Sequence, residues 1–420
     1  MLTLYNTALV PLRAVAALWA TWASRRPGRA LEWGERRARI VPRVRPGGIW
    51  IHGASVGEAR LVGVLADALR ERRPEIPLCA SAITRTGRTQ LPAPPRVDAC
   101  FYMPLDFPGY PTRFLQSIRP RVLTLVETEL WPNLLHEAVT QGVLVVLVNG
   151  RLSSERMSRY RRLKRLYRPL LERVARVGGQ SLEDVTRFTE LGVQSTAAMV
   201  TGNIKYDLPP PEKDSLILRG RFGLAASRPV VVAGSTGPGE EAQVLDAFLE
   251  ARDTHEGLFL ILAPRHPGRT EEVARESERR GLRFHRLSRG DDARAGSFDG
   301  LLVDTVGELP AMYGLAIAAF VGGSLVPVGG HNVLEPAAAG VPVLFGPHTH
   351  HVLEPASALL NAGGAMRIQD AASLARAWKQ LLSDKNVRER MSRSAEGVIR
   401  ANRGALDRNV DLVLSVLAEG

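Results

Sequence analysis

The stretch PVGGHNVLEPAAAGVPVLFGP, residues 327–347, decides the fold class. Two glycines, a histidine and an asparagine lead into a helical pattern with Glu335 in its first turn. An alanine-rich segment, Gly340 and a short apolar strand follow. A helix between strand-like segments is typical of a parallel sheet with crossover helices. Glycines at the entrance to a helix suit an anionic ligand, because the free backbone N–H groups there attract negative charge.

The same alternation of strand-like and helix-like segments extends over the chain after Arg39, so we predict an α/β protein. A first series of strands is expected at 47–55, 76–84, 99–106, 121–129, 143–150 and 175–181. A second series is expected at 229–236, 258–266, 282–288, 300–306, 316–324 and 341–347.

A proline-rich polar segment separates the two series and suits a linker between domains. We therefore expect two Rossmann-like domains that face each other across a central cleft. The predicted ranges are 1–30 for an N-terminal helix, 31–207 for the first domain, 208–228 for the linker and 229–420 for the second domain.

The composition agrees with a globular protein of two ordinary domains. The chain has 420 residues, of which 45% are hydrophobic and 23% are charged,. Cys79 and Cys100 are its two cysteines and show no metal-binding spacing, which fits a reducing compartment,. We expect neither a bound metal nor a cofactor.

The net charge of +12 comes from two local segments rather than from a uniformly basic surface,. Residues 151–176 hold ten Arg and Lys against two Glu, and residues 1–39 hold seven Arg against two Glu. Aromatic residues make up only 6% of the chain, and no nucleic-acid-binding module is visible,. These observations exclude a nucleic-acid-binding protein and favour contact with anionic lipid or phosphates. A basic segment that is simply a solvated helix face is the alternative.

The N-terminal segment, residues 2–23, is apolar but is interrupted by Pro11 and Arg13. It is too broken for a standard membrane span of about 20 apolar residues. We expect a marginal span or an interfacial helix with Trp19 and Trp22 at headgroup depth, followed by arginines on the cytoplasmic side. A signal peptide and a helix packed on the soluble domain are the alternatives.

Ligands of open parallel sheets bind outside the carboxyl ends of the strands. No Walker A loop and no G-x-G-x-x-G pattern is present. The main sequence signals for binding a nucleoside triphosphate or a dinucleotide are therefore missing,. Three strand ends of the second series instead carry small, hydroxyl or charged residues that suit a phosphate and ribose hydroxyls. We expect donor-side contacts from Ser235, Thr236, Arg265, Gly322, Gly323, Ser324, Gly330, His331, Asn332 and Glu335.

Asn332 and Glu335 also have a structural interpretation, because their spacing is close to that of a capping box. The stretch His348–His351 raises the question of a metal site, but no carboxylate or thiolate accompanies it at a recognisable spacing,. It is more typical of a pocket-lining loop.

In the first series Glu58 is the outstanding polar residue, in the first turn of the helix after the first strand. It is either an acid that complements the helix dipole or a general base. Ser55 and Gly57 beside it are expected on the acceptor side, with Gly57 leaving room for substrate. Glu127 and Glu129 follow another strand, with Trp131 as a platform for the acceptor. The sequence favours neither a structural nor a functional role for these two acids.

These motifs resemble the 3-deoxy-D-manno-octulosonic acid (Kdo) transferase family. The likeness runs through nearly the whole chain, and the order of motifs makes chance agreement negligible. It rests on WGER, ASVGE, ETELWPN, NGRLS, TGNIKYD, GST..GEE, PRHP, GELPAMYGLA.AAFVGGSL and GGHNVLEPAAAGVPVLFGPHT.

The resemblance implies a GT-B glycosyltransferase that transfers Kdo from CMP-Kdo to a lipid A precursor, with inversion and without a metal. It implies that Glu58 is the base that deprotonates the lipid hydroxyl. It also implies that Lys205, Ser235, Thr236, Arg265, Asn332 and Glu335 handle the CMP group and the Kdo carboxylate. Glu335 is then the residue expected to hold the ribose hydroxyls.

The chain departs from the family pattern in its loops, with His350-His351 in place of Phe-Asn, Gly-Pro within GSTGPGEE and TRTG in place of Thr-Pro-Thr-Gly. Another GT-B enzyme, such as a UDP-sugar transferase or a UDP-sugar 2-epimerase, is the alternative. Such an enzyme would share the glycine loops but would have no reason to carry ETELWPN or a membrane-seeking N-terminus.

Overall fold

The computed structural model describes residues 1–208, 215–290 and 298–419. The chain divides into two compact units, residues 1–207 with 403–420, and residues 208–402. Each unit contains a sheet of seven parallel strands within the described residues. The α/β class and the division near residue 207 agree with the sequence pattern.

The first unit has the strand order β3-β2-β1-β4-β5-β6-β7. The central strands are buried and mostly apolar, as expected of a parallel sheet covered on both faces,. The strands are β1 (Ile49–His52), β2 (Leu78–Ala82), β3 (Ala99–Tyr102), β4 (Val122–Val126), β5 (Leu144–Gly150), β6 (Arg176–Gly179) and β7 (Ala198–Val200).

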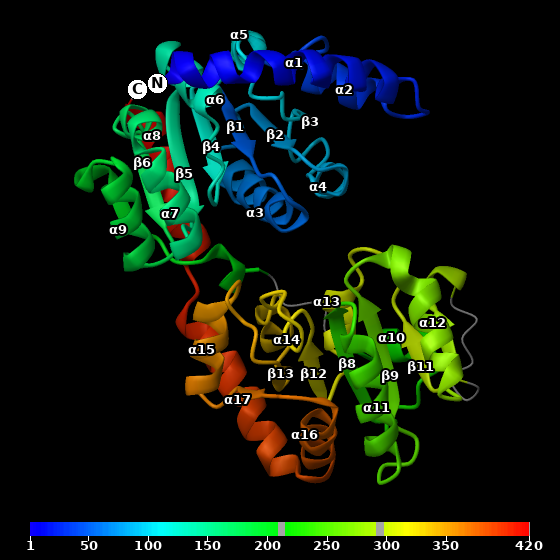
Figure 1. Cartoon of the computed structure of the whole chain (residues 1–420). Helices are drawn as coiled ribbons and strands as arrows, with labels where there is room; N and C mark the ends of the chain where they lie inside the picture. The colour runs from blue at the N-terminus through cyan, green and yellow to red at the C-terminus, as the bar shows by residue number, and fades with distance from the viewer. Residues whose placement is uncertain (209–214, 291–297, 420) are drawn as a thin grey trace. The chain divides into compact units, whose positions relative to one another are not determined.

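Helices cover both faces of this sheet (Figure 1). One face carries α5 (Tyr110–Ile118), α6 (Pro132–Thr140), α8 (Lys164–Leu171) and α9 (Leu182–Leu191), whose apolar residues form one core with Trp50, Leu123 and Val145. The remaining helices are α2 (Ala30–Arg36), α3 (Val56–Arg72), α4 (Arg85–Gln90), α7 (Ser154–Arg162) and α18 (Ala405–Glu419).

The last helix, α18, belongs to the first unit, which corrects the predicted second domain of 229–420. Its buried Asn409 accepts hydrogen bonds from the backbone N–H of Asn149 and the hydroxyl of Thr201. Arg72 at the end of α3 forms ion pairs with Asp407 and Asp411 of α18. These contacts join residues more than 200 positions apart, so no local sequence pattern predicts them.

The second unit has the strand order β10-β11-β9-β8-β12-β13-β14. Its strands are β8 (Val230–Thr236), β9 (Phe259–Pro264), β10 (Phe284–Arg286), β11 (Gly300–Leu302), β12 (Ala318–Val321), β13 (Val343–Phe345) and β14 (Ala365–Arg367). Its helices are α10 (Ser215–Arg221), α11 (Glu240–Arg252), α12 (Thr270–Arg279), α13 (Leu309–Tyr313), α14 (Leu334–Ala338), α15 (Leu353–Asn361), α16 (Ala371–Ser383) and α17 (Lys385–Ala401).

Side chains of α11, α12 and α16 form the core on one face of the second sheet, and residues 312–313 of α13 join the core on the other face. Phe222 and Leu224 are buried in this second core. The predicted linker 208–228 is therefore too long, because its C-terminal part is folded into the unit. Its proline run, residues 209–211, lies outside the described residues.

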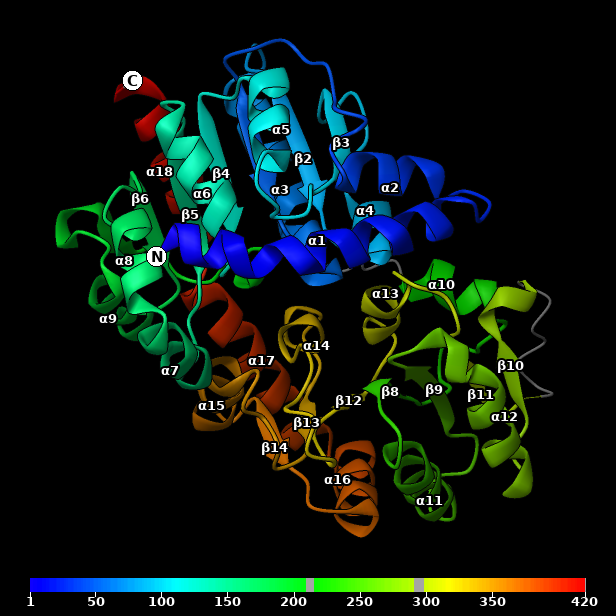
Figure 2. The same cartoon turned by 45° about the horizontal axis from the view of Figure 1, so that its top comes forward.

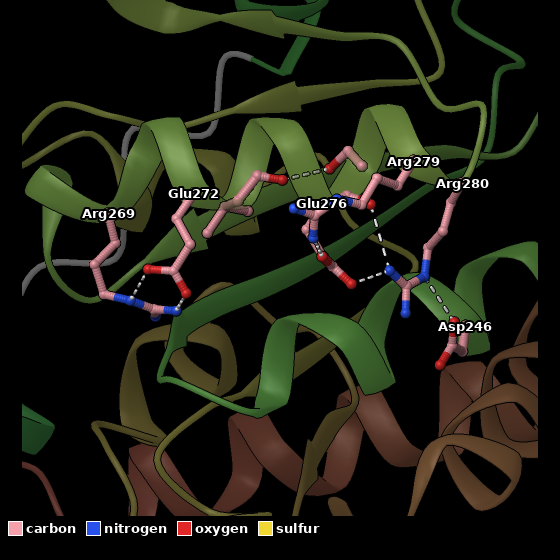
Figure 3. Close-up of polar contacts among 8 residues, drawn as sticks. Asp246, Arg269, Glu272, Glu276, Arg279 and Arg280 are labelled. Atoms are coloured by element: carbon pink, nitrogen blue, oxygen red, sulfur yellow. Dashed lines mark hydrogen bonds and ion pairs between the residues drawn. The ribbon is translucent and has the colours of Figure 1, made fainter.

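Charged side chains form ion pairs along α12 (Figure 3). Arg269 pairs with Glu272, and Arg280 pairs with Glu276 and with Asp246 of α11. Exposed pairs of this kind each contribute about 0–1 kcal/mol to the free energy of unfolding. Of these three pairs, the one between Arg280 and Asp246 joins the end of α12 to α11.

The N-terminal segment forms one long helix, α1 (Leu2–Ser24), on the same side of the first unit as α5 and α6 (Figure 2). Several contacts attach it, among them three that involve polar or aromatic side chains. The Tyr5 hydroxyl donates to Asp106, Arg13 stacks over the Tyr110 ring, and Trp19 meets Trp33 edge to face. Among the described helices, none combines the length and the apolar character needed to cross a membrane.

Candidate functional site

The first group of predicted site residues lies at the carboxyl edge of the first sheet, where β1 runs into α3. Ser55 caps α3 by accepting the N–H of Glu58, and its hydroxyl lies 2.9 Å from Glu58 Oε1. Glu58 Oε2 accepts the N–H of Ala54 at 2.6 Å. The carboxylate is therefore held back over the start of the helix. Gly57 is exposed, and a Cβ there would meet only the Ser55 hydroxyl at 3.9 Å, so space for a ligand is open.

Glu58 shares this edge with the two other predicted acids. Burial raises the pKa of Glu58, and the nearby charges of Glu127 and Glu129 raise it further, against the lowering effect of its bonds to Ala54 and Ser55. A carboxylate whose pKa is raised is a better proton acceptor when ionised. Glu58 accepts the N–H of Ala54 at the start of α3, which is a structural role, and its role as a general base stays a prediction.

Glu127 is paired with Lys205, whose ammonium lies 2.7 Å from Glu127 Oε1. Burial raises the pKa of Glu127, but Lys205, Arg151 and Arg156 outweigh it, so the pKa is lowered and the carboxylate is held ionised. Glu127 has a φ of 62°, in the left-handed region that non-glycine residues rarely adopt,. Strain of this kind is common at functional sites.

Two hydrogen bonds to backbone N–H groups hold the loop that carries Lys205. Asn149, at the end of β5, accepts the N–H of Ile204 at 2.9 Å, and Asn203 accepts the N–H of Lys205 at 3.0 Å. Lys205 was expected among the donor contacts, and the structure places it in the first unit beside the acids. Its contact with the donor stays a prediction.

Glu129 lies against the indole of Trp131, whose Nε1 donates to Glu129 Oε2 at 2.9 Å. His52 of β1 is fully buried, and its Nε2 lies 3.8 Å from the same carboxylate oxygen, beyond hydrogen-bond distance,. The other ring nitrogen of His52 contacts the Ser81 hydroxyl at 2.9 Å. The sequence gives no sign that His52 belongs to this group, because a histidine inside a buried strand resembles any core residue.

The second group lies at the carboxyl edge of the second sheet, in the loops that follow β8 and β12. Ser235 has a φ of 57°, and Thr236 is buried with a hydroxyl that makes no hydrogen bond among the described residues. Arg265 at the end of β9 is exposed, and its N–H donates to the Thr236 carbonyl. A hydroxyl without a partner, on a residue whose backbone contacts an exposed arginine, suits an anionic group.

The loop after β12 is tied together by its own backbone. Gly322 must be a glycine, since a Cβ there would lie 2.5 Å from the Ser235 carbonyl oxygen. The carbonyl of Gly323 accepts the N–H groups of Gly329 and Gly330 at 3.0 and 2.6 Å. Ser324 is buried, and its hydroxyl donates to the Val321 carbonyl and accepts the N–H of Gly346. Ser324 therefore shapes the loop through contacts within the protein.

The histidines of this region pack over the glycines. A Cβ on Gly323 would lie 2.8 Å from the His331 ring, and one on Gly329 would lie 2.6 Å from both the His350 and the His351 ring. Burial lowers the pKa of His331 to about 4, and the charges of Arg265, His351 and His266 add to the effect. His331 is thus neutral at physiological pH. Within the described ranges, no group of three or more His, Cys, Asp or Glu side chains is arranged to hold a metal.

Helix α14 begins at Leu334, two residues after the predicted cap. Asn332 still accepts the N–H of Leu334 at 3.1 Å, so the structural half of its predicted role is present. Glu335 lies in the first turn, and its charge, after burial, raises the pKa of Tyr313. Tyr313 approaches the same strand end, since a Cβ on Gly234 would lie 2.2 Å from its hydroxyl.

Comparison with known proteins supports the resemblance seen in the motifs. A family model described as 3-deoxy-D-manno-octulosonic-acid transferase matches residues 31–208. The chain is 35% identical over 376 residues to the 3-deoxy-D-manno-octulosonic acid transferase of Haemophilus influenzae, covering 88% of this chain and 87% of that one. It is also 35% identical over 426 residues to the transferase of the same name from Bordetella pertussis, covering 97% of each chain.

The chain belongs to the Kdo transferase family.

Solved structures agree with this family at the level of the fold. A glycosyltransferase from Rickettsia africae matches with a TM-score of 0.57 at 11% identity, over 90% of this chain and 99% of that one. A UDP-GlcNAc 2-epimerase from Neisseria meningitidis matches with a TM-score of 0.58 at 12% identity, over 89% and 100% of the two chains. At such identity the likeness shows a GT-B-like fold and says nothing of the substrate.

Within this Kdo transferase fold, two residues outside the predicted set hold the predicted ones in place. Asn149 fixes the Lys205 loop, and Glu240 accepts backbone N–H groups from both loops of the second group. The sequence feature that could have indicated Asn149 is the Asn-Gly pair at the end of a strand, but this pair is also typical of ordinary turns. The signal for Glu240 was an acid in the first turn of a helix, which usually complements the helix dipole.

Proposed function

We propose that this chain transfers Kdo from CMP-Kdo to a hydroxyl of a lipid A precursor, with inversion at the anomeric carbon and with Glu58 as the general base. The hydroxyl oxygen of the acceptor forms the new bond to the anomeric carbon of Kdo. The bond from that carbon to the phosphate oxygen of CMP breaks, and its electron pair leaves with the phosphate. The proton of the acceptor hydroxyl passes to the carboxylate of Glu58.

The observation that carries the proposal is the environment of Glu58. Its carboxylate is fixed over the start of α3 by Ala54 and Ser55, beside open space at Gly57. Its pKa is raised by burial and then by Glu127 and Glu129. A fixed, basic carboxylate next to an exposed glycine is what proton abstraction from a bound hydroxyl needs.

The cations around Glu127 support an acceptor that carries phosphates. Lys205 pairs with Glu127, and Arg151 and Arg156 lower its pKa, so the charges of all three reach this edge of the sheet. Other arginines of the basic segment are paired elsewhere, such as Arg161 with Glu190. Tyr160 and Tyr167 pack on each other with ring centroids 4.8 Å apart, and Tyr167 is buried, so this pair belongs to the core rather than to a lipid-binding face.

On the donor side we propose that Thr236 and Arg265 receive anionic groups of CMP-Kdo, and that Glu335 holds the ribose hydroxyls. The leaving group carries one phosphate, which positioned hydroxyls and a cation stabilise directly. Ser235, Gly330, His331 and Asn332 line the same loops. His331 is neutral and adds no positive charge at this edge, whereas Arg265 is a cation there.

We also propose that α1 lies in the cytoplasmic face of the inner membrane. The helix exposes a run of large apolar side chains to solvent and is followed by Arg25, Arg26 and Arg29. A helix of this type binds anionic membranes through its apolar face and its cations. The exposed residues are Leu4, Val10, Leu12, Val15, Leu18, Trp19 and Trp22.

A donor competition tests the proposal against the UDP-sugar alternative. Isothermal titration of the wild-type chain with CMP and with UMP should give the tighter Kd for CMP. Tighter binding of UMP would contradict the proposed donor, whatever the acceptor is.

A further inference from the structure

One buried carboxylate connects the two loops of the second sheet edge. Glu240, the first residue of α11, is fully buried. Its Oε2 accepts the N–H groups of Gly237 and Gly323 at 2.8 and 2.6 Å. Its Oε1 accepts the N–H groups of Ser324 and Leu325 at 2.9 and 2.8 Å. Four backbone groups from two different strand ends thus converge on one side chain.

The four bonds require the carboxylate form of Glu240. Burying a charge is costly unless hydrogen bonds compensate for it. All four partners of Glu240 are donors, so a proton on either oxygen would displace one of them. No Lys or Arg pairs with Glu240 in the part of the chain that the structure describes. The charge is therefore balanced by N–H groups and by the N-terminus of α11.

The loops that Glu240 joins carry most of the predicted donor contacts. Gly237 directly follows Ser235 and Thr236 at the end of β8. Gly323 follows β12, and its carbonyl accepts the N–H groups of Gly329 and Gly330, which lead to His331 and Asn332. A chain of hydrogen bonds thus runs from Glu240 to the start of α14.

The same bonds decide which groups are available to a ligand. Backbone N–H groups after a parallel strand commonly bind a phosphate. Here the N–H groups of Gly237, Gly323 and Ser324 are occupied by Glu240. A phosphate or carboxylate of the donor must therefore bind to other groups, among them the Thr236 hydroxyl and Arg265.

We propose that Glu240 is a positioning residue for the donor, and this inference rests on the proposed use of CMP-Kdo. Glu240 occupies the place that a bound anion has in other phosphate loops, and it holds the 322–332 loop in its binding form before the donor arrives. The donor then binds to a loop that is already ordered. The entropy cost of ordering the loop therefore does not weaken the affinity for the donor.

The matched control for Glu240 is its neighbour Glu241. Glu241 is also buried in the first turn of α11, but it pairs with the Arg269 side chain at 2.6 Å. Glu240→Gln keeps the shape of the side chain but turns an N–H₂ group toward backbone donors. Glu241→Gln makes the same chemical change without touching the loop. Glu240→Asp is a second variant, which keeps the charge but is one methylene too short to reach all four N–H groups.

The test combines hydrogen exchange with nucleotide binding and kinetics on the full chain. In Glu240→Gln, peptides covering 322–332 should exchange at least about tenfold faster than in Glu241→Gln, and Glu240→Asp should lie between. Glu240→Gln should also raise the Kd for CMP and the KM for CMP-Kdo about tenfold or more, with a smaller fall in kcat. Unchanged exchange, equal exchange in both Gln variants, or a Kd like that of the wild type would overturn the inference.

Failure of the proposed function gives a different result. Wild-type protein that binds UMP more tightly than CMP would contradict the donor, and the same three variants titrated with UMP would then decide the role of Glu240. Loss of UMP affinity in Glu240→Gln alone, with faster loop exchange, would support the positioning role. Equal UMP affinity in all variants would refute it.

Discussion

The ammonium of Lys205 lies 2.7 Å from the carboxylate of Glu127, and the two residues come from segments 78 positions apart in the chain. The pair joins the loop after β7 to the end of β4, next to Glu58. Lys205 thereby sets the charge of one of the two acids that surround the proposed base.

Replacing this lysine should affect both transfer and stability. In Lys205→Met the pKa of Glu127 should rise, because its closest cation is gone. The free energy of unfolding should fall by an amount between that of an exposed pair, about 1 kcal/mol, and that of a buried one, about 3–5 kcal/mol. Kdo transfer should drop at least about tenfold. Urea unfolding and a transfer assay measure the two effects.

The control for this change is Lys379→Met, which breaks the surface pair with Glu250. It should leave transfer unchanged and cost at most about 1 kcal/mol. Equal transfer by Lys205→Met and wild type would show that the buried pair has no part in the reaction.

The pH dependence of transfer follows from the raised pKa of Glu58. A general base works in its ionised form, so kcat/KM should fall as the pH drops through this pKa. Glu129 contributes to the raised pKa through its negative charge. In Glu129→Gln the pKa of Glu58 should therefore fall, and the acid limb of the profile should move to lower pH. An acid limb that stays in place would mean that another group controls it.

The membrane contact of α1 can be tested on a single exposed side chain. Leu18 is 76% exposed on α1, and Leu182 is 73% exposed on α9. Leu18→Glu should lose most of its binding to vesicles of phosphatidylethanolamine and phosphatidylglycerol in a flotation assay, because a charge enters the apolar face. Leu182→Glu should float like wild type. If the two variants float equally well, α1 is not the membrane contact.

The proposed role of Glu335 predicts a specific loss of discrimination. Wild-type chain should bind CMP more tightly than a CMP analogue without ribose hydroxyls, by about tenfold. Glu335→Gln should reduce this ratio, whereas Glu354→Gln, a change at an exposed acid in the first turn of the next helix, should not. Titration calorimetry gives both ratios. A ratio in Glu335→Gln that equals the wild-type value would place the ribose elsewhere.

Much of the fold follows from the sequence, because buried parallel strands are continuous apolar runs. All twelve predicted strands are present within the two sheets. The strands that were missed, β7 and β14, have three residues each and lie at sheet edges, where the hydrophobic signal is weakest. Helix α18 was assigned to the wrong unit, because an amphipathic pattern does not tell which sheet the helix will cover.

The site could be predicted only in part. Glu58, Glu127 and Glu129 were predicted from their places at strand ends, and the charges of Glu127 and Glu129 add to the effect of burial in raising the pKa of Glu58. Their roles in the reaction stay predictions. Lys205 came from the family resemblance and not from local pattern. Glu240 was missed because its function depends on four backbone groups, three of which lie more than 80 residues away. Long-range contacts of this kind produce no motif with a recognisable spacing in the sequence.

The proposed mechanism depends on Glu58 accepting the proton during Kdo transfer. The most direct measurement incubates wild type, Glu58→Gln and Glu71→Gln with CMP-Kdo and a lipid A precursor, and follows the added Kdo mass on the lipid. Glu71 is an exposed acid at the far end of the same helix. We expect transfer by wild type and Glu71→Gln, with a loss of at least about a hundredfold in Glu58→Gln. Transfer by Glu58→Gln at the wild-type rate, or none by wild type, would contradict this mechanism.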